Sequence, residues 1–335
     1  MENILINIVF TTVGILLLYL GGTYIVDGSV IVANKLKIPS IVIGLTVVSM
    51  GTSMPELFVS LFGAIRGESA IAVGNVIGSN IFNIVFVLGI SSLFMNMVAV
   101  KKSYYISMAS MFIMYIALFF ILLNKDTKNL TGDKISVIEG IILFIVLCIY
   151  IYYLYNVISK DENEIATFDK EIDETKHKNT SITRSIFKIL VAIFALAFGS
   201  DIFLKGVIGV FRNFLSEHII GFIVVAVGTS IPELVTSTIA AIKKESDISI
   251  GNIVGSNIFN VGGVLGISAI TSFKYGGIIL NKEQNYLIDF SIMLFSGLLL
   301  MLFTMKGKKL GKINGIIFLL IYIAYVLYLL KSTIV

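Results

Sequence analysis

Two short stretches, GTSMPE at residues 51–56 and GNVIGSNIFN at residues 74–83, occur twice in this chain. Their second copies are GTSIPE at residues 228–233 and GNIVGSNIFN at residues 251–260, displaced by 177 residues without a gap. Roughly half of residues 44–92 are identical in the second copy, and most of the differences are apolar exchanges. The shared residues are mainly Gly, Pro, Glu, Asn, Ser and Thr. Such self-similarity indicates a fold built from two related units.

The composition places these repeats in a membrane. The 335 residues are 57% hydrophobic and 14% charged, with a mean hydropathy of +0.97. Soluble domains have about half apolar and about a quarter charged residues. Here the excess lies in long apolar runs, which indicate spans of a lipid bilayer rather than one large core. The net charge of +4 is spread over short loops and does not favour a nucleic acid partner.

The apolar runs predict an all-α membrane protein of about ten transmembrane helices, because a spanning helix needs about 20 apolar residues. The first runs are residues 4–26, 41–65, 70–95, 104–123 and 135–158. The later runs are residues 186–207, 219–242, 248–272, 286–305 and 313–330. Residues 159–184, between the two sets, are rich in Asp, Glu and Lys and predict a flexible linker.

The linker divides the chain into two repeats, at residues 1–158 and 185–335. The doubled motif occupies residues 44–95 of the first repeat and residues 221–272 of the second. Because each repeat has an odd number of spans, the second enters the membrane from the opposite side, which gives an inverted 5+5 repeat. Many secondary transporters are built in this way, and so are channels with a pseudo-twofold pore. The architecture therefore leaves the mechanism open.

The loop charges predict the orientation in the cell membrane. If the N-terminus lies outside, the cytoplasmic loops hold about twice as many Lys and Arg residues as the outer loops. An excess of Lys and Arg on the cytoplasmic side is usual in membrane proteins. We therefore expect both termini outside the cytoplasm and the linker, residues 159–184, inside it. The first run lacks a basic region before it and a small-residue cleavage site after it, so we expect a retained span rather than a signal peptide.

Two glutamates, Glu56 and Glu233, stand near the middle of their apolar runs. A carboxylate at that depth costs at least a few kcal/mol, and such residues usually line a polar pathway. Each glutamate follows a proline, which removes a backbone donor and kinks or breaks the helix. A broken helix in mid-membrane is tolerated where it is buried in protein or lines a water-filled cavity. The inverted repeat then brings both carboxylates together near the midplane.

The motifs surround these carboxylates with neutral oxygens. Ser79 and Asn83, like their copies Ser256 and Asn260, are four residues apart and share one helix face. Carboxylate, hydroxyl, amide and carbonyl oxygens suit hard cations such as Ca²⁺ and Na⁺, whereas softer metals favour His or Cys. The motif glycines, which allow close approach to a neighbouring helix, are Gly74, Gly78, Gly251 and Gly255.

The charge of the two glutamates predicts exchange rather than leak. One Ca²⁺ or a set of Na⁺ ions can neutralise the pair. Without a cation, two buried carboxylates close together disfavour each other's ionised form. The empty site should therefore cross the membrane with difficulty, and protons should compete with the cations. A purely structural role would require a Lys or Arg at the same depth, and neither repeated segment has one.

These motifs resemble the two alpha repeats of the cation/Ca²⁺ exchanger superfamily, and in particular its prokaryotic sodium/calcium exchanger branch. The resemblance is residue-level over roughly 50 residues in each half. It implies an inverted repeat around cation sites arranged in a diamond, with the first and sixth helices sliding as the gate. By motif position it implies that Glu56 and Glu233 bind Ca²⁺ and that Asn83 and Asn260 complete the centre. The other implied ligands are the backbone carbonyls of Thr52, Thr229, Ser49 and Ala226 and, for Na⁺, the serines Ser53, Ser79, Ser230 and Ser256.

One position bears on the subtype. Potassium-dependent relatives, and some prokaryotic members, carry an aspartate where Asn260 stands. Asn260 lacks the negative charge of that aspartate. Without this third negative charge, Ca²⁺ and K⁺ cannot bind together electroneutrally. We therefore expect potassium independence.

Taken together, these features predict a Na⁺/Ca²⁺ antiporter that works by alternating access, with Ca²⁺ and Na⁺ as transported ions and no resident cofactor. A proton-driven exchanger of Ca²⁺ or another divalent cation is the alternative, and a cation channel is a further, less favoured one. An enzyme is not expected, because neither a nucleophile–base pair nor an aspartate dyad lies at membrane depth.

Overall fold

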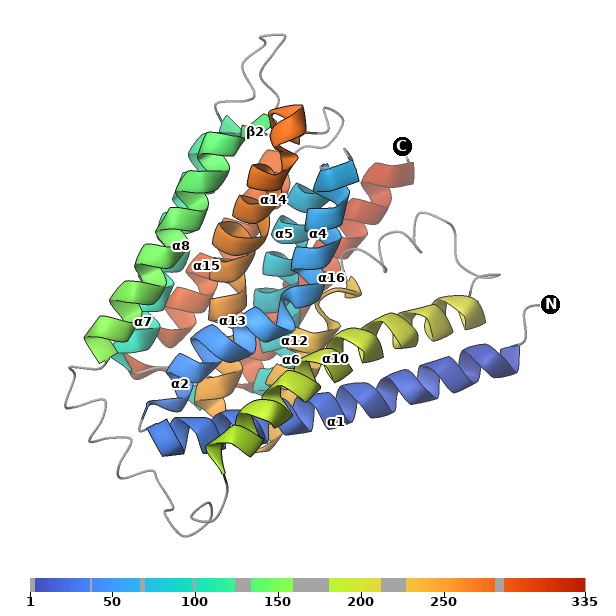
Figure 1. The fold of residues 1–335 in the computed structure, drawn as a ribbon, viewed down its shortest axis with the longest axis vertical. Coiled ribbons are helices and arrows are strands. Elements are labelled where there is room, and N and C mark those ends of the chain that lie inside the picture. The colour runs from blue at the N-terminus through green and yellow to red at the C-terminus, as the bar shows by residue number, and fades with distance from the viewer. Residues whose placement is uncertain are drawn as a thin grey trace.

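The computed structural model of this chain is almost entirely helical. It describes residues 4–36, 38–66, 70–98, 101–123, 134–158, 181–211, 227–280 and 286–334. Figure 1 shows a central bundle and, at a steep angle to it, a pair of long helices, α1 and α10, that lie side by side.

The two halves consist of similar series of helices. Those of the first half are α1 (Ile4–Leu36), α2 (Ser40–Ile43), α3 (Ser49–Thr52), α4 (Met54–Arg66), α5 (Ala70–Ile81), α6 (Leu88–Phe94), α7 (Lys102–Leu123) and α8 (Val137–Ile158). Those of the second half are α10 (Ile182–Phe211), α12 (Ile231–Ile242), α13 (Ser246–Phe259), α14 (Gly266–Thr271), α15 (Tyr286–Thr304) and α16 (Lys312–Ile334). Wider π-helical turns join some of them into longer spans, namely η1 (Gly44–Val48), η2 (Phe82–Val87) and η4 (Asn260–Leu265).

In the described part of the chain, eight helices or helix runs are long and apolar enough to cross a membrane. The bent pair Ser40–Thr52 and Met54–Arg66 makes a ninth if it is counted as one span. Each of these coincides with a predicted apolar run. Of the remaining predicted run, residues 219–242, only the last part is described, and it contains α12; residues 219–226 lie outside the described residues. The count of ten therefore stays a prediction.

Helices α1 and α10 form an antiparallel pair that is longer than their predicted runs. They contain 33 and 30 residues, and α1 is thus about 50 Å long, against about 30 Å of bilayer hydrocarbon. Small residues hold the pair together along its length. An added Cβ on Gly14 would lie 2.6 Å from the Phe203 backbone, and one on Gly28 would lie 2.8 Å from the Ile189 side chain. The close packing of α1 and α10 continues beyond the apolar runs, where polar residues interrupt the sequence. The predicted runs therefore end before the helices do.

The expectation of an all-α protein needs a small correction. Strand β1 (Met97–Val98) pairs antiparallel with β4 (Lys309–Leu310), and β2 (Lys134–Ser136) pairs antiparallel with β3 (Gly277–Ile279). Each ladder ties a loop of the first half to a loop of the second. Strands of two or three residues show no hydrophobic alternation that a sequence pattern could reveal.

The repeated motifs lie in the buried centre of the bundle. The spans Ile71–Phe94 and Ser246–Tyr275, which carry the second stretch of each copy, are the most enclosed. In their most apolar 18-residue stretches, 78% and 89% of the residues are buried. Figure 1 shows α4, α5, α13 and α14 between α8 on one side and α16 on the other. Both outer helices expose large apolar side chains, among them Tyr152 and Leu320, as expected of helices that face lipid.

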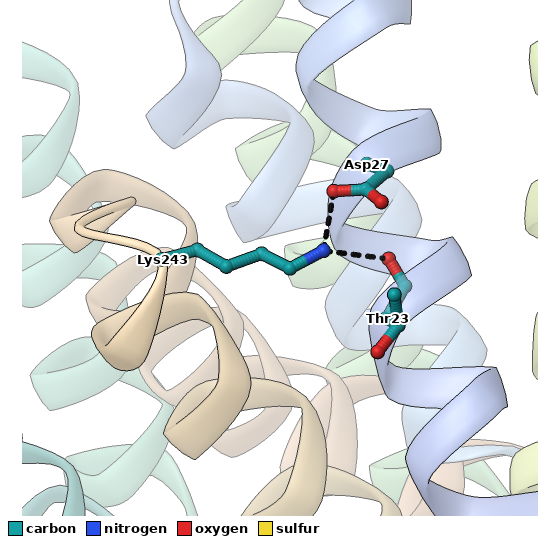
Figure 2. Close-up of polar contacts among 3 residues, drawn as sticks. All are labelled: Thr23, Asp27 and Lys243. Carbon is teal, nitrogen blue, oxygen red and sulfur yellow. Dashed lines mark hydrogen bonds and ion pairs between the residues drawn. The ribbon is translucent and has the colours of Figure 1, made fainter.

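A salt bridge joins α1 to this bundle. Lys243 directly follows α12, and its Nζ lies 2.5 Å from Asp27 Oδ1 on α1. The same ammonium donates to the Thr23 carbonyl at 3.5 Å (Figure 2). The contact attaches the α1–α10 pair to the far end of the helix that begins at the second GTSxPE motif.

Candidate cation site

The first copy of the GTSxPE motif breaks the helix that carries it, and in the second copy a helix begins directly after the motif serine. Ser53 stands between α3 and α4 with φ −85° and ψ 12°, and the segments on either side are bent by 45°. Ser230 has nearly the same conformation, with φ −92° and ψ 8°, directly before α12. Pro55 and Pro232 therefore stand in the first turn of a helix, where a missing amide hydrogen is tolerated. The predicted break is confirmed in the first copy, where it lies two residues before the proline.

This break places each glutamate in the first turn of a helix. Glu56 belongs to the first turn of α4 and Glu233 to that of α12. The amide groups of a first turn have no partner within the helix, and their partial positive charge favours a carboxylate. Both glutamate side chains are fully buried. The sequence Ser-x-Pro-Glu thus starts a helix and points a carboxylate into the protein interior.

Each glutamate accepts a hydrogen bond from the serine of the opposite copy. Ser53 Oγ donates to Glu233 Oε1 at 2.7 Å, and Ser230 Oγ donates to Glu56 Oε1 at 2.9 Å. Ser256 Oγ also donates to Glu233 Oε1, at 3.4 Å. The two motif copies therefore meet in one cluster, although they lie 177 residues apart in the chain.

Five buried oxygens of this cluster have no hydrogen-bond partner in the described part of the chain. They are Glu56 Oε2, Glu233 Oε2, Asn83 Oδ1, Asn260 Oδ1 and Ser79 Oγ. A buried polar atom without a partner costs about 1–3 kcal/mol, and a charged one costs more. Neither glutamate forms an ion pair with a basic residue in the described part of the chain. The ion pairs there are Lys101–Asp247, Lys205–Asp201 and Lys243–Asp27. The cluster thus combines negative charge with free oxygens, which is the donor set of a hard cation.

Two further asparagines, which were not among the predicted ligands, connect the copies. Thr52 Oγ1 donates to Asn252 Oδ1 at 3.0 Å, and Thr229 Oγ1 donates to Asn75 Oδ1 at 3.2 Å. The amide groups of both asparagines donate in turn to the serine four residues after each glutamate, at 2.9 and 3.0 Å. Their identity in the two copies was the available sequence signal, but it gave no indication of partners on the other half.

Eleven of the twelve predicted ligands lie in the described part of the chain, and all eleven are buried. The twelfth, Ala226, lies outside the described residues. Ser49 lies against the second copy, because its carbonyl accepts a hydrogen bond from Ser256 Oγ at 3.4 Å. Asn83 and Asn260 each donate to an asparagine of the other half.

The close approach predicted for the motif glycines is confirmed in the second copy. An added Cβ on Gly251 would lie 2.8 Å from the Ile41 carbonyl oxygen, and one on Gly255 would lie 2.5 Å from the Leu45 carbonyl oxygen. At Gly78 it would meet nothing within 4 Å in the described part of the chain, so the close approach stays a prediction there. The residue that corresponds to Leu45 by the repeat offset is at position 222, outside the described residues.

The fold and the site together define a multi-pass membrane protein whose centre holds two carboxylates from two copies of one motif. Comparison with known proteins then gives the family. The chain belongs to the sodium/calcium exchanger protein family, whose model matches residues 6–156 and 184–331. This membership confirms the resemblance to a prokaryotic cation/Ca²⁺ exchanger. It also agrees with the expectation that the chain is not an enzyme, because the family consists of transporters.

Similar proteins match along nearly the whole chain. The sodium/calcium exchanger MaX1 of Methanosarcina acetivorans is 27% identical over 356 residues, which cover 97% of this chain and 99% of that protein. The putative antiporter CaxA of Alkalimonas amylolytica is 31% identical over 333 residues, which cover 98% of this chain and 100% of that protein. A solved structure of the sodium-calcium exchanger NCX_Mj matches with a TM-score of 0.78 at 27% identity, covering 97% of this chain and 99% of that one.

Proposed function

We propose that this chain is a secondary antiporter that exchanges Na⁺ for Ca²⁺ across the cell membrane by alternating access. The observation that carries the proposal is the glutamate pair. Each buried carboxylate uses one oxygen to accept a hydrogen bond from the opposite copy, and its other oxygen has no partner among the described residues. Ca²⁺ takes about six to eight oxygen ligands, with carboxylates and carbonyls prominent among them. The family of the chain and the names of its relatives support the same pair of ions.

The proposed ligands are the predicted ones. Glu56 and Glu233 bind Ca²⁺ through their carboxylates, and Asn83 and Asn260 complete the centre through amide oxygens that no described residue contacts by a hydrogen bond. The remaining proposed ligands are the backbone carbonyls of Thr52, Thr229, Ser49 and Ala226 and, for Na⁺, the side chains of Ser53, Ser79, Ser230 and Ser256.

The charge of the pair supports exchange rather than passive flow. One Ca²⁺ or a set of Na⁺ ions neutralises the two carboxylates, whereas the unloaded centre carries buried charge that a nonpolar surrounding disfavours. The loaded centre therefore moves between the two faces of the membrane more readily than the unloaded one. A proton-driven exchanger remains the alternative, because protons neutralise the same carboxylates.

We further propose that residues 1–158 and 185–335 are inverted copies of five spans each, with the motifs at residues 44–95 and 221–272. The contacts that support this are reciprocal: Ser53 bonds Glu233 while Ser230 bonds Glu56. The two strand ladders also join the halves, because β1 of the first half pairs with β4 of the second and β2 of the first half pairs with β3 of the second. A pseudo-twofold axis in the membrane plane produces such reciprocity. The tenth span would comprise residues 219–242, of which α12 is the described end.

The proposed orientation has both termini outside the cytoplasm and the linker, residues 159–184, inside it. Cysteine labelling tests this directly, because Cys148 is the sole cysteine of the chain. In a Cys148→Ser background, a cysteine placed in the linker should react with a membrane-impermeant reagent in inverted vesicles and not in intact cells. The opposite pattern would reverse the topology.

The experiment that tests the function is ⁴⁵Ca²⁺ uptake into proteoliposomes that contain the purified chain. We expect uptake to follow an outward Na⁺ gradient, to be unaffected by K⁺ at constant ionic strength, and to disappear without a counter-ion. Uptake that follows a pH gradient instead of the Na⁺ gradient would favour the proton-driven alternative. Single-channel currents in planar bilayers would indicate a channel and overturn the proposal.

A further inference from the structure

Four asparagines make a closed set of hydrogen bonds between the two halves. Asn83 Nδ2 donates to Asn257 Oδ1 at 3.1 Å, and Asn260 Nδ2 donates to Asn80 Oδ1 at 3.0 Å. Asn80 Nδ2 donates to the backbone carbonyl of Asn257, and Asn257 Nδ2 donates to that of Asn80, both at 3.3 Å. All four side chains are fully buried. Asn83 and Asn260 are proposed ligands, whereas Asn80 and Asn257 have no assigned role.

The polarity of these bonds follows from the backbone carbonyls. An asparagine amide has one accepting end and one donating end, and it can turn either end towards a partner. A backbone carbonyl can only accept. Asn80 must therefore turn its Nδ2 towards the Asn257 carbonyl, which leaves its Oδ1 to accept from Asn260. Asn260 must in turn use its Nδ2 for this bond, and its own Oδ1 becomes the free end.

The same sequence of constraints operates in the other direction. Asn257 turns its Nδ2 to the Asn80 carbonyl, so that its Oδ1 accepts from Asn83 and the Oδ1 of Asn83 is left free. Both free ends, Asn83 Oδ1 and Asn260 Oδ1, are buried oxygens without a hydrogen-bond partner in the part of the chain that the structure describes. The orientation matters for a cation, since an amide oxygen attracts it and an amide NH₂ group repels it.

We propose that Asn80 and Asn257 are positioning residues that fix the amide orientation of Asn260 and Asn83, so that both present oxygen to a hard cation. Each half of the chain thereby orients a ligand that belongs to the other half. The inference rests on the proposed function, because it assigns these residues a part in binding the transported cation. Groups that orient a metal ligand typically change metal affinity by about 10- to 100-fold when they are removed.

The test measures Ca²⁺ binding directly, by equilibrium dialysis of ⁴⁵Ca²⁺ with the purified full chain in detergent. Asn80→Ala and Asn257→Ala should each weaken Ca²⁺ binding about tenfold and lower the maximal exchange rate less than they lower affinity. A purely structural role would instead reduce the thermal denaturation midpoint while leaving the affinity of the folded fraction unchanged, and that result would overturn the inference.

Pairs of substitutions separate orientation from general loosening. In an Asn260→Ala background, Asn80→Ala should weaken Ca²⁺ binding by less than about twofold, because no amide remains to be oriented. In an Asn83→Ala background, which is the matched control three residues away, it should again weaken binding about tenfold. Asn257→Ala should show the reverse dependence. Losses that multiply in all four pairs would overturn the proposal.

Two outcomes are kept apart by this design. If the folded wild-type chain binds no Ca²⁺, the proposed function fails. If the wild type binds Ca²⁺ and the pairs show no cross-half dependence, only the positioning role fails. Where an alanine variant does not elute as a folded protein, Asn80→Ser or Asn257→Ser replaces it in the same pairs, since a serine side chain is too short to reach the opposite amide.

Discussion

Ser53 in the first half of the chain and Glu233 in the second are joined by a hydrogen bond of 2.7 Å, and Ser230 and Glu56 repeat this bond in the opposite sense at 2.9 Å. Neither half therefore completes the environment of its own glutamate. The carboxylate comes from one copy of the motif and its hydroxyl donor from the other. A rearrangement of one half relative to the other would alter both carboxylates at once.

Removing either hydroxyl should weaken exchange. Ser53→Ala and Ser230→Ala each delete a hydrogen bond to a buried charged group, which typically contributes about 1.5–3 kcal/mol. We expect Na⁺-driven ⁴⁵Ca²⁺ uptake to fall at least tenfold at limiting Ca²⁺. Ser107→Ala is the matched control, because Ser107 is also a buried serine but bonds Tyr150 at 2.9 Å, outside the cluster. Equal losses in all three variants would argue against a specific role for the two motif serines.

Tyr115 provides a test of the asparagine set from outside it. Its hydroxyl accepts a hydrogen bond from Asn257 Nδ2 at 3.2 Å, and Asn257 in turn accepts from Asn83. Tyr115→Phe should weaken Ca²⁺ binding by roughly fivefold, the equivalent of about 1 kcal/mol for one hydrogen bond. Tyr150→Phe, which removes another buried tyrosine hydroxyl, should leave Ca²⁺ affinity unchanged. Dialysis with ⁴⁵Ca²⁺ compares the two variants, and an identical affinity for Tyr115→Phe and wild type would contradict the expectation.

The salt bridge between Lys243 and Asp27 should stabilise the attachment of α1. Its side chains are partly exposed, at 31% and 49%, so the contribution is expected to be about 1 kcal/mol or less. Asp27→Asn and Lys243→Gln should each lower the thermal denaturation midpoint in detergent slightly. The exchanged pair, Asp27→Lys with Lys243→Asp, should recover most of the loss. A double variant that is less stable than either single one would show that the pairing itself contributes nothing.

The glycine seam between α1 and α10 predicts a larger effect on stability. An added Cβ on Gly206 would overlap the Thr11 backbone nitrogen, where only backbone displacement could make room. Gly206→Ala should therefore destabilise the chain by about 1–3 kcal/mol, as overpacking typically does. Gly297→Ala is the control, because its nearest neighbour is the flexible end of Met111 at 3.3 Å. Thermal denaturation in detergent should separate the two variants clearly; equal midpoints would indicate that α1 and α10 can move apart without loss.

The central features of the site could be predicted because they have few tolerable alternatives. A carboxylate and a proline inside an apolar run require a polar, protein-lined break, and the positions of Glu56 and Glu233 agree with this. The ends of α1 could not be predicted in the same way, since they depend on how its glycines face Phe203 and Ile189 on a distant helix. Local apolar content does not contain that register.

The roles of the asparagines were hidden for a related reason. Asn75, Asn80, Asn252 and Asn257 are visible as identical residues in the two motif copies. Their hydrogen-bond partners, however, lie across the interface between the halves. A repeat pattern reveals which residues recur, but the direction of a hydrogen bond follows only from which groups meet in three dimensions. The distinction between ligands and orienting residues therefore required the structure.

Whether the two glutamates bind the transported cations is tested by comparing Na⁺-gradient-driven ⁴⁵Ca²⁺ exchange in wild type, Glu56→Gln and Glu233→Gln. Glutamine keeps the shape of the side chain and removes its charge, so both variants should remain folded. Glu139→Gln serves as the control, because Glu139 accepts hydrogen bonds from Ser136 at the start of α8, outside the cluster. We predict that either substitution in the pair nearly abolishes exchange while Glu139→Gln retains it. Normal exchange by both Glu56→Gln and Glu233→Gln would contradict the account.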